Sequence, residues 1–235
     1  ILVMIVCLFS CTYIVRSIVE EKSSKLVESL MVSVKSEALI LGKILAVMTF
    51  IFAMIAALII GSGLSYVVTG MFMDTSVIGE SLASMGITSD LLTIGPGLIV
   101  IALISLLLAY MIFALISALN GAGCSNMEDV EAANTTAVMV VMAGYLVSVI
   151  GTSFGSDPSL FLSLCPIVSA FSAPIYYVIG DIGLGVLIAS WIIQIACILL
   201  IHKVSSKVYD SLIMYKGSRL KTGQILAMAG RKGVK

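Results

Sequence analysis

Long runs of apolar residues dominate the sequence, and the polar residues gather in the segments between them. A helix needs about 20 mostly apolar residues to cross the hydrocarbon core of a bilayer, which is about 30 Å thick. Runs of that length predict four membrane-spanning helices, at residues 44–69, 97–119, 136–154 and 184–202. The apolar run at residues 1–15 is shorter, and we interpret it as the truncated end of a further span.

The basic residues are confined to two segments. All thirteen Lys and Arg residues lie within residues 16–43 or 203–235, and none lies between these segments. Because cytoplasmic loops of membrane proteins are enriched in Lys and Arg, both segments are expected in the cytoplasm. Four spans lie between the two segments, and an even number of crossings returns the chain to the same side of the membrane. The tail at 203–235 is then a basic cytoplasmic segment that faces anionic lipid.

One further apolar stretch, at residues 160–180, is ambiguous. Pro166, Pro174 and Gly180 interrupt it. If it crossed the membrane, the two basic segments would lie on opposite sides, against the positive-inside rule. A re-entrant hairpin on the outer face fits better, provided that surrounding protein covers its irregular backbone.

The composition agrees with an all-α integral membrane protein built as a polytopic helical bundle. The chain is 60% hydrophobic and 11% charged, with a mean hydropathy of +1.18. Soluble domains are about a quarter charged. Binding to nucleic acid is not expected, since the basic segments only flank spans. The five cysteines have no metal-ligand spacing and are expected to be small buried residues.

The predicted spans contain no Asp, Glu, Lys or Arg. Ion-coupled transporters and intramembrane enzymes usually need ionisable groups at membrane depth, so neither class is favoured. No catalytic, cofactor-binding or metal-binding residue is predicted. Ala53, Ala57 and Gly61 are small residues spaced four apart, and they predict a close helix–helix contact.

The first cytoplasmic segment contains a helical pattern at residues 17–34. Ser17 and Glu20 form a capping box, in which each side chain can bond an unpaired backbone N–H at a helix start. Apolar residues then recur at three- and four-residue steps, at Val27, Leu30, Met31 and Val34. Such an amphipathic helix either rests on membrane lipid or docks on a cytoplasmic partner. Its balanced acids and bases favour the partner.

The second cytoplasmic loop carries a similar signal. Ser125 and Glu128 form another capping box, and Glu128 and Asp129 lie where the positive end of a helix dipole favours acids. The loop is either the simple start of the next helix or a second contact with the same partner.

These cytoplasmic residues resemble the ABC-2 type permeases. The resemblance rests on Glu20-Glu21-Lys22, on the run from Leu26 to Leu30, on the run from Val34 to Gly42-Lys43, and on the loop at residues 125–129. It is greatest to the branch that includes sodium-extrusion permeases. The resemblance implies the last five spans of a six-span half-transporter. It also implies an export function driven by a separate ATP-binding-cassette ATPase subunit, with a second permease copy or a related half-subunit as partner.

The resemblance also implies a coupling helix at 17–34 that docks on the ATPase. Its contacts would be Glu20, Glu21, Lys22, Lys25 and Glu28, with Glu128 and Asp129 in the second loop. The residues support the division of labour, because the sequence has no Gly-x-x-x-x-Gly-Lys-Ser/Thr phosphate-binding loop. The chain is therefore expected to be a transport subunit without an ATPase site of its own.

Two other functions stay open at the level of sequence. A gradient-driven secondary transporter or channel without an ATPase would need an ion site made of hydroxyls, such as those of Ser105, Tyr110 and Ser117. A membrane-anchoring or assembly protein would need no site. The sequence does not identify the substrate.

Overall fold

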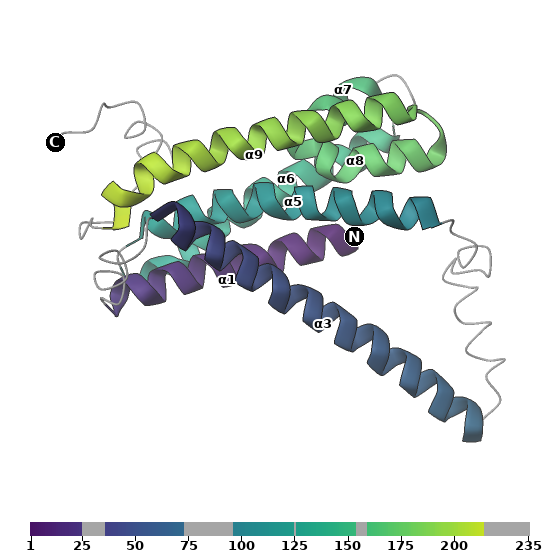
Figure 1. Ribbon diagram of the computed structural model, residues 1–235, viewed down its shortest axis with the longest axis horizontal. Coiled ribbons are helices and arrows are strands. Elements are labelled where there is room, and N and C mark those ends of the chain that lie inside the picture. The colour runs from purple at the N-terminus through teal and green to yellow at the C-terminus, as the bar shows by residue number, and fades with distance from the viewer. Residues whose placement is uncertain (25–35, 73–95, 125, 154–158, 214–235) are drawn as a thin grey trace.

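The computed structural model describes residues 1–24, 36–72, 96–124, 126–153 and 159–213. All regular elements in these ranges are helical (Figure 1), and five of the helices are long and apolar enough to cross a membrane. The polytopic all-α architecture expected from the sequence is thereby confirmed. The elements are α1 (Leu2–Ser23), α3 (Ser36–Phe72), α5 (Pro96–Ala122), the single-turn 3-10 helix η2 (Met127–Asp129), α6 (Val130–Ser153), α7 (Ser159–Leu164), α8 (Pro166–Ile179) and α9 (Leu184–Ile213).

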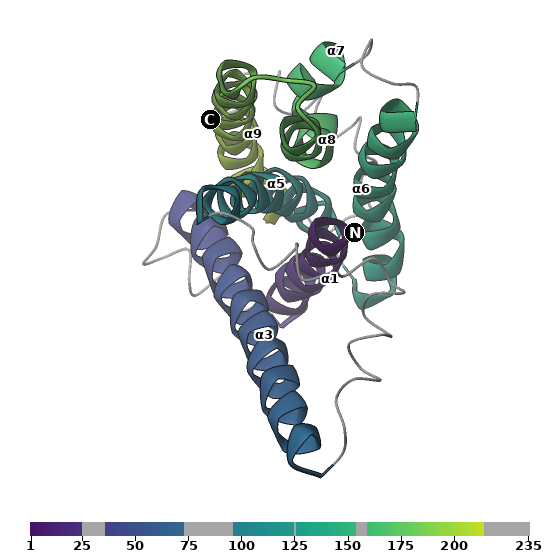
Figure 2. The same cartoon turned by 90° about the vertical axis from the view of Figure 1, so that its right-hand side faces the viewer.

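Helix α5 lies at the centre of the bundle. It packs against α1, α3, α6, α8 and α9, and the end-on view shows these helices arranged around it (Figure 2). One buried cluster joins α1, α3 and α5 through residues such as Ile14, Ile44 and Tyr110. A second cluster joins α1, α5, α6 and α8 around the stacked rings of Phe113 and Phe171. The core is thus formed by side chains that meet on the central helix.

The described parts of the two basic segments, at the end of α1, the start of α3 and the end of α9, lie at the same end of the bundle. Figure 1 shows the last turn of α1, the first turn of α3 and the last turn of α9 together at one end. The opposite end carries α7, α8 and the start of α9. This arrangement matches the predicted parity of the spans, and the positive-inside rule makes the basic end cytoplasmic. We call it the inner end below.

The spans continue as helix beyond the apolar runs that predict them. Helix α1 does not stop at Val15 but runs on to Ser23. At 1.5 Å per residue, its 22 residues reach about 33 Å. The predicted helix start at Ser17 is therefore wrong, because Ser17 lies inside α1. Once a helix is nucleated, each added residue gains a backbone hydrogen bond, so polar residues extend it at little cost. The remainder of the predicted coupling helix, residues 25–34, lies outside the described residues.

Residues 159–179 form the two short helices α7 and α8, neither of which is among the five candidate membrane-spanning helices. Cys165 is the N-cap of α8 and Pro166 its first residue, where a missing N–H costs nothing. Gly180 ends α8 with a φ of 92°, and its N–H donates to the carbonyl oxygens of Tyr176 and Tyr177. The predicted breaks at Pro166 and Gly180 are correct, whereas Pro174 stays inside α8.

Helix α3 leaves the bundle as it runs away from the inner end (Figures 1 and 2). Its buried residues are Ile40, Ile44 and Ile51, all in its first half. Farther along, Gly61 has no other heavy atom within 4 Å of where a Cβ would be. The contact predicted from Ala53, Ala57 and Gly61 is therefore not made within the described part of the chain, and all three residues are exposed.

Candidate functional site

The inner end of the bundle gathers the charged residues that the resemblance singles out. Glu20, Glu21 and Lys22 occupy the last two turns of α1, and Glu128 and Asp129 occupy η2. Helix α1 packs against both η2 and α6. Two of the predicted contacts, Lys25 and Glu28, lie outside the described residues.

Of the acids on α1, only Glu20 faces outward. Its carboxylate is exposed and pairs with Arg16 one turn earlier, with 2.7 Å between Oε1 and the guanidinium Nε. An exposed i,i+4 pair of this kind contributes little to stability. The Glu20 side chain is therefore available to a partner at small cost.

Glu21, by contrast, faces the neighbouring helix α3. Its Oε2 lies 2.7 Å from the Nζ of Lys43, whose side chain is only 10% exposed. The same Nζ also donates to the backbone carbonyl of Ser17, at 3.1 Å. Because the Ser17 carbonyl accepts a hydrogen bond from Lys43 and the Glu21 carboxylate forms an ion pair with it, the lysine is held against α1 at two points.

Lys22 faces a different neighbour, the end of α5. Its Nζ donates to the carbonyl oxygen of Ala122, at 2.9 Å. The last four carbonyls of a helix lack partners within the helix, and a cation there also interacts favourably with the negative end of the helix dipole. The other three carbonyls at the end of α5 accept hydrogen bonds from the next two residues. Gly123 N–H donates to Leu119, Cys124 N–H donates to Gly121, and the Cys124 thiol donates to Asn120.

The acids of the second loop lie in η2, beside α1. Asn126 is the N-cap and makes no side-chain capping bond, and Ser125 lies outside the described residues. The observed N-cap, Asn126, is therefore one residue later than the predicted one, Ser125. Glu128 is exposed and Asp129 is half-buried. Val15 and Val19 of α1 pack against Cys124, Val130 and Ala133 around this turn, which places Glu20 and Glu128 on elements in direct contact.

The structure therefore divides the predicted site into two groups. Glu20, Glu128 and Asp129 are accessible and can meet another protein. Glu21 and Lys22 are engaged inside the bundle and link α1 to α3 and α5. The contact that Lys43 makes with Glu21 was not predicted from the sequence. The signal for Lys43 was the Gly42-Lys43 pair at the start of an apolar run, which places a single cation at the edge of a span.

A polar strip runs along the outward side of α1 toward α6. Thr12 is exposed and donates to the Leu8 carbonyl, and its Oγ1 lies 3.3 Å from Oδ1 of Asn134 on α6. Arg16 lies one turn farther toward the inner end and is exposed. Tyr13 is also exposed, and its ring makes an edge-to-face contact with Phe50 of α3. Polar side chains at membrane depth usually face protein or a water-filled path instead of lipid.

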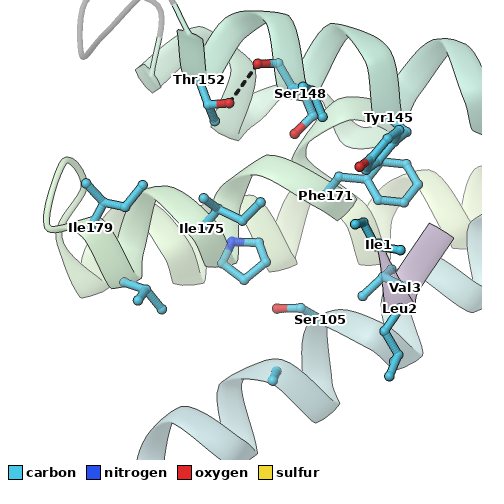
Figure 3. Close-up of a pocket in the computed structure, with 14 residues that line it drawn as sticks. Ile1, Leu2, Val3, Ser105, Tyr145, Ser148, Thr152, Phe171, Ile175 and Ile179 are labelled. Atoms are coloured by element: carbon cyan, nitrogen blue, oxygen red, sulfur yellow. Dashed lines mark hydrogen bonds between the residues drawn. The ribbon is translucent and has the colours of Figure 1, made fainter. Parts of the chain in front are cut away.

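A cavity of about 460 Å³ lies at the other end, between α5, α6 and α8 beside the start of α1 (Figure 3). Its walls are mainly apolar, formed by residues such as Phe171, Ile175 and Ile179. Ser105 and Ser148 contribute hydroxyls. Cavities with this balance of lining suit a largely apolar molecule.

The hydroxyls that a gradient-driven transporter would need do not converge. All three lie on α5, and each is engaged with a different group. Ser105 accepts from the indole Nε1 of Trp191 at 3.1 Å, Tyr110 donates to the Ile44 carbonyl at 2.6 Å, and Ser117 donates to the Phe113 carbonyl at 2.7 Å. Within the described residues, no group of three or more His, Cys, Asp or Glu side chains could hold a metal ion.

Comparison with known proteins gives a family and no individual relative. No curated protein matches the chain, and no solved structure matches it. The family model described as ABC-2 family transporter protein matches residues 1–202. This match spans all five candidate membrane helices through most of α9, together with both groups of charged residues at the inner end. The chain belongs to the ABC-2 family of transporter proteins and is a multi-pass membrane permease component.

Proposed function

We propose that this chain is the permease subunit of an ATP-driven exporter and that a separate ATPase subunit docks on its inner end. Family membership makes it a membrane transport component. The sequence carries no phosphate-binding loop for ATP. The energy for transport must then come from a partner, and the cytoplasmic ends of the spans are where such a partner can reach it.

The observation that carries this proposal is the acidic surface formed by the exposed Glu20 and Glu128 with the half-buried Asp129. These residues come from two elements that pack together, α1 and η2. Glu20 also precedes, by five positions in the sequence, the segment at residues 25–35 that holds the predicted contacts Lys25 and Glu28. A partner with basic residues opposite this surface would be attracted and oriented by charge complementarity. Glu21 and Lys22 would support the surface from behind without touching the partner.

The polar strip on α1 and α6 is the best candidate for the transport path. A single chain would expose Thr12, Tyr13 and Arg16 to lipid, whereas a second permease copy or a related half-subunit would enclose them. Two such strips facing one another would form a polar route through the membrane. The substrate itself is not identified by these side chains.

Co-purification tests the docking surface directly. The full-length protein is purified from membranes in mild detergent, and any co-purifying P-loop ATPase is identified by mass spectrometry. The wild type should retain an ATPase, and the Glu20→Lys, Glu128→Lys double variant should lose it because like charges then face the partner. Asp181→Lys is the matched control, since Asp181 is an exposed acid at the opposite end.

Two results would contradict the proposal. One is a wild type that brings down no ATPase under conditions that preserve a known exporter complex. The other is a double variant that retains as much ATPase as the Asp181→Lys control. In the first case, flux in vesicles driven by an ion gradient without ATP would identify the gradient-driven alternative.

A further inference from the structure

Helix α3 is anchored to the rest of the protein almost entirely at its inner end. Its buried residues are Ile40, Ile44 and Ile51, and from Ala53 onward nearly all of its described side chains are exposed or only partly covered. Tyr110 of α5 reinforces this anchor by donating to the Ile44 carbonyl. The orientation of a helix that is more than 50 Å long (37 residues at about 1.5 Å each) therefore depends on contacts in its first few turns.

The Glu21–Lys43 ion pair lies within this anchor. It joins the last turn of α1 to the second turn of α3, so it closes the base of the chain segment that connects the two helices. Lys43 is largely buried, and its Nζ is also held by the Ser17 carbonyl. Charged hydrogen-bonding groups with little solvent around them are expensive to separate, unlike the exposed Arg16–Glu20 pair.

Lys22 connects the same turn of α1 to α5. Lys22 bonds the Ala122 carbonyl of α5, whereas the adjacent Glu21 pairs with Lys43 of α3. The two side chains therefore point toward different helices. One turn of α1 is consequently tied to two neighbouring helices. A displacement of that turn must move the start of α3 and the end of α5 with it.

We propose that Glu21 and Lys43 are positioning residues that transmit movement from the ATPase to α3. The inference rests on the proposed function. A push on the end of α1 is passed to the start of α3, because the ion pair prevents these two helix ends from separating. The push therefore rotates α3 about its inner anchor instead of being absorbed at the junction of α1 and α3. The outer half of α3, which is not held by the described bundle, then moves farthest.

The test uses the exposed Met71 near the outer end of α3 as a reporter and needs no knowledge of the substrate. Met71→Cys is introduced into the full-length protein in complex with its ATPase, in membrane vesicles. The rate at which a membrane-impermeant maleimide labels Cys at this position is measured with and without ATP and orthovanadate, which trap the ATPase. The same chain without the added cysteine gives the background from native cysteines.

Charge reversal and its compensation distinguish positioning from mere structural support. The wild-type background should show an ATP-dependent change in labelling rate. Glu21→Lys and Lys43→Glu should each lose this change. The Glu21→Lys, Lys43→Glu double variant should regain part of it, because the ion pair is restored in reverse while the bond to the Ser17 carbonyl is not. Glu21→Gln keeps the shape of the side chain and should lose most of the change even if a reversal variant folds poorly. Lys203→Glu, at an exposed lysine of the inner end, should behave as wild type.

The readouts separate failure of the inference from failure of the proposed function. Each variant is checked for bound ATPase, for ATP hydrolysis and for melting temperature. If the single variants keep both the ATPase and the ATP-dependent change, or if the double variant fails to restore any of the change, the positioning role is wrong. A wild type that binds and hydrolyses ATP without altering the labelling rate also overturns it. If no ATPase binds to the wild type, the proposed function itself fails, and this inference falls with it.

Discussion

At the scale of single residues, neighbouring charged side chains of α1 lie in different environments. Glu20 faces outward and is free to meet a partner, whereas Glu21 and Lys22 face inward and bind α3 and α5. A helix turns by about 100° per residue, so consecutive residues cannot share a face. The sequence Glu20-Glu21-Lys22 thus places one contact on the surface and two inside it.

Lys22 offers a direct test of this division. Lys22→Met removes the bond to the Ala122 carbonyl at the end of α5 and should destabilise the protein by about 1 kcal/mol. Thermal unfolding in detergent measures the effect. Lys203→Met removes the same charge from an exposed lysine and should leave the melting temperature unchanged. Equal melting temperatures for the two variants would show that the bond does not contribute.

At the scale of elements, glycine permits a close contact between α1 and the inner end of α5. A Cβ on Gly121 of α5 would lie 3.2 Å from both the Cα and the carbonyl oxygen of Val15 on α1. These are backbone atoms, which cannot move aside as a side-chain tip can. Close packing of α1 on α5 therefore requires glycine here, and this packing also brings Lys22 within reach of Ala122.

Replacing this glycine should force the two helices apart. Gly121→Leu adds a side chain where the backbone of α1 lies and should cost about 1–3 kcal/mol by overpacking. Gly61→Leu on α3 is the matched control, because nothing lies within 4 Å of its Cβ position. Melting temperatures of the purified variants check the difference. A Gly121→Leu protein as stable as Gly61→Leu would contradict the packing shown.

At the scale of the whole molecule, the α7–α8 hairpin decides the topology. This segment enters and leaves at the same end of the bundle, so the end of α6 and the start of α9 are both at that end. Helix α9 then runs back to the inner end (Figure 1). Both basic segments then share one side, as the positive-inside rule requires. A full crossing at 160–180 would separate them.

Cysteine labelling in intact cells tests this arrangement. Ser153→Cys and Asp181→Cys flank the hairpin at exposed positions, and both should react with a membrane-impermeant maleimide applied from outside. Ser24→Cys and Lys203→Cys should react only after the cells are permeabilised, because they lie at the inner end. The unaltered chain serves as the background. Labelling of only one of Ser153→Cys and Asp181→Cys in intact cells would mean that the hairpin is a full crossing.

The local sequence was sufficient for the membrane class and for the existence of several long apolar helices. Apolar length and the placement of Lys and Arg are local properties, and transfer into lipid depends on them directly. The breaks at Pro166 and Gly180 were also predictable, because a missing N–H and a positive φ are requirements of single residues. The acids that form the exposed surface at the inner end were likewise visible in the sequence.

The roles of individual charges depended on how the helices pack. Capping residues at Ser17 suggested a helix start, but the backbone hydrogen bonds of α1 continued through it, and contact with α5 supports that continuation. The partners of Glu21 and Lys22 lie 22 and 100 positions away in the chain. Which helices meet, and on which faces, is set by the simultaneous packing of side chains from several elements. No local pattern contains that information, so only the folded bundle distinguishes the charges engaged between helices, Glu21 and Lys22, from the exposed acids Glu20 and Glu128.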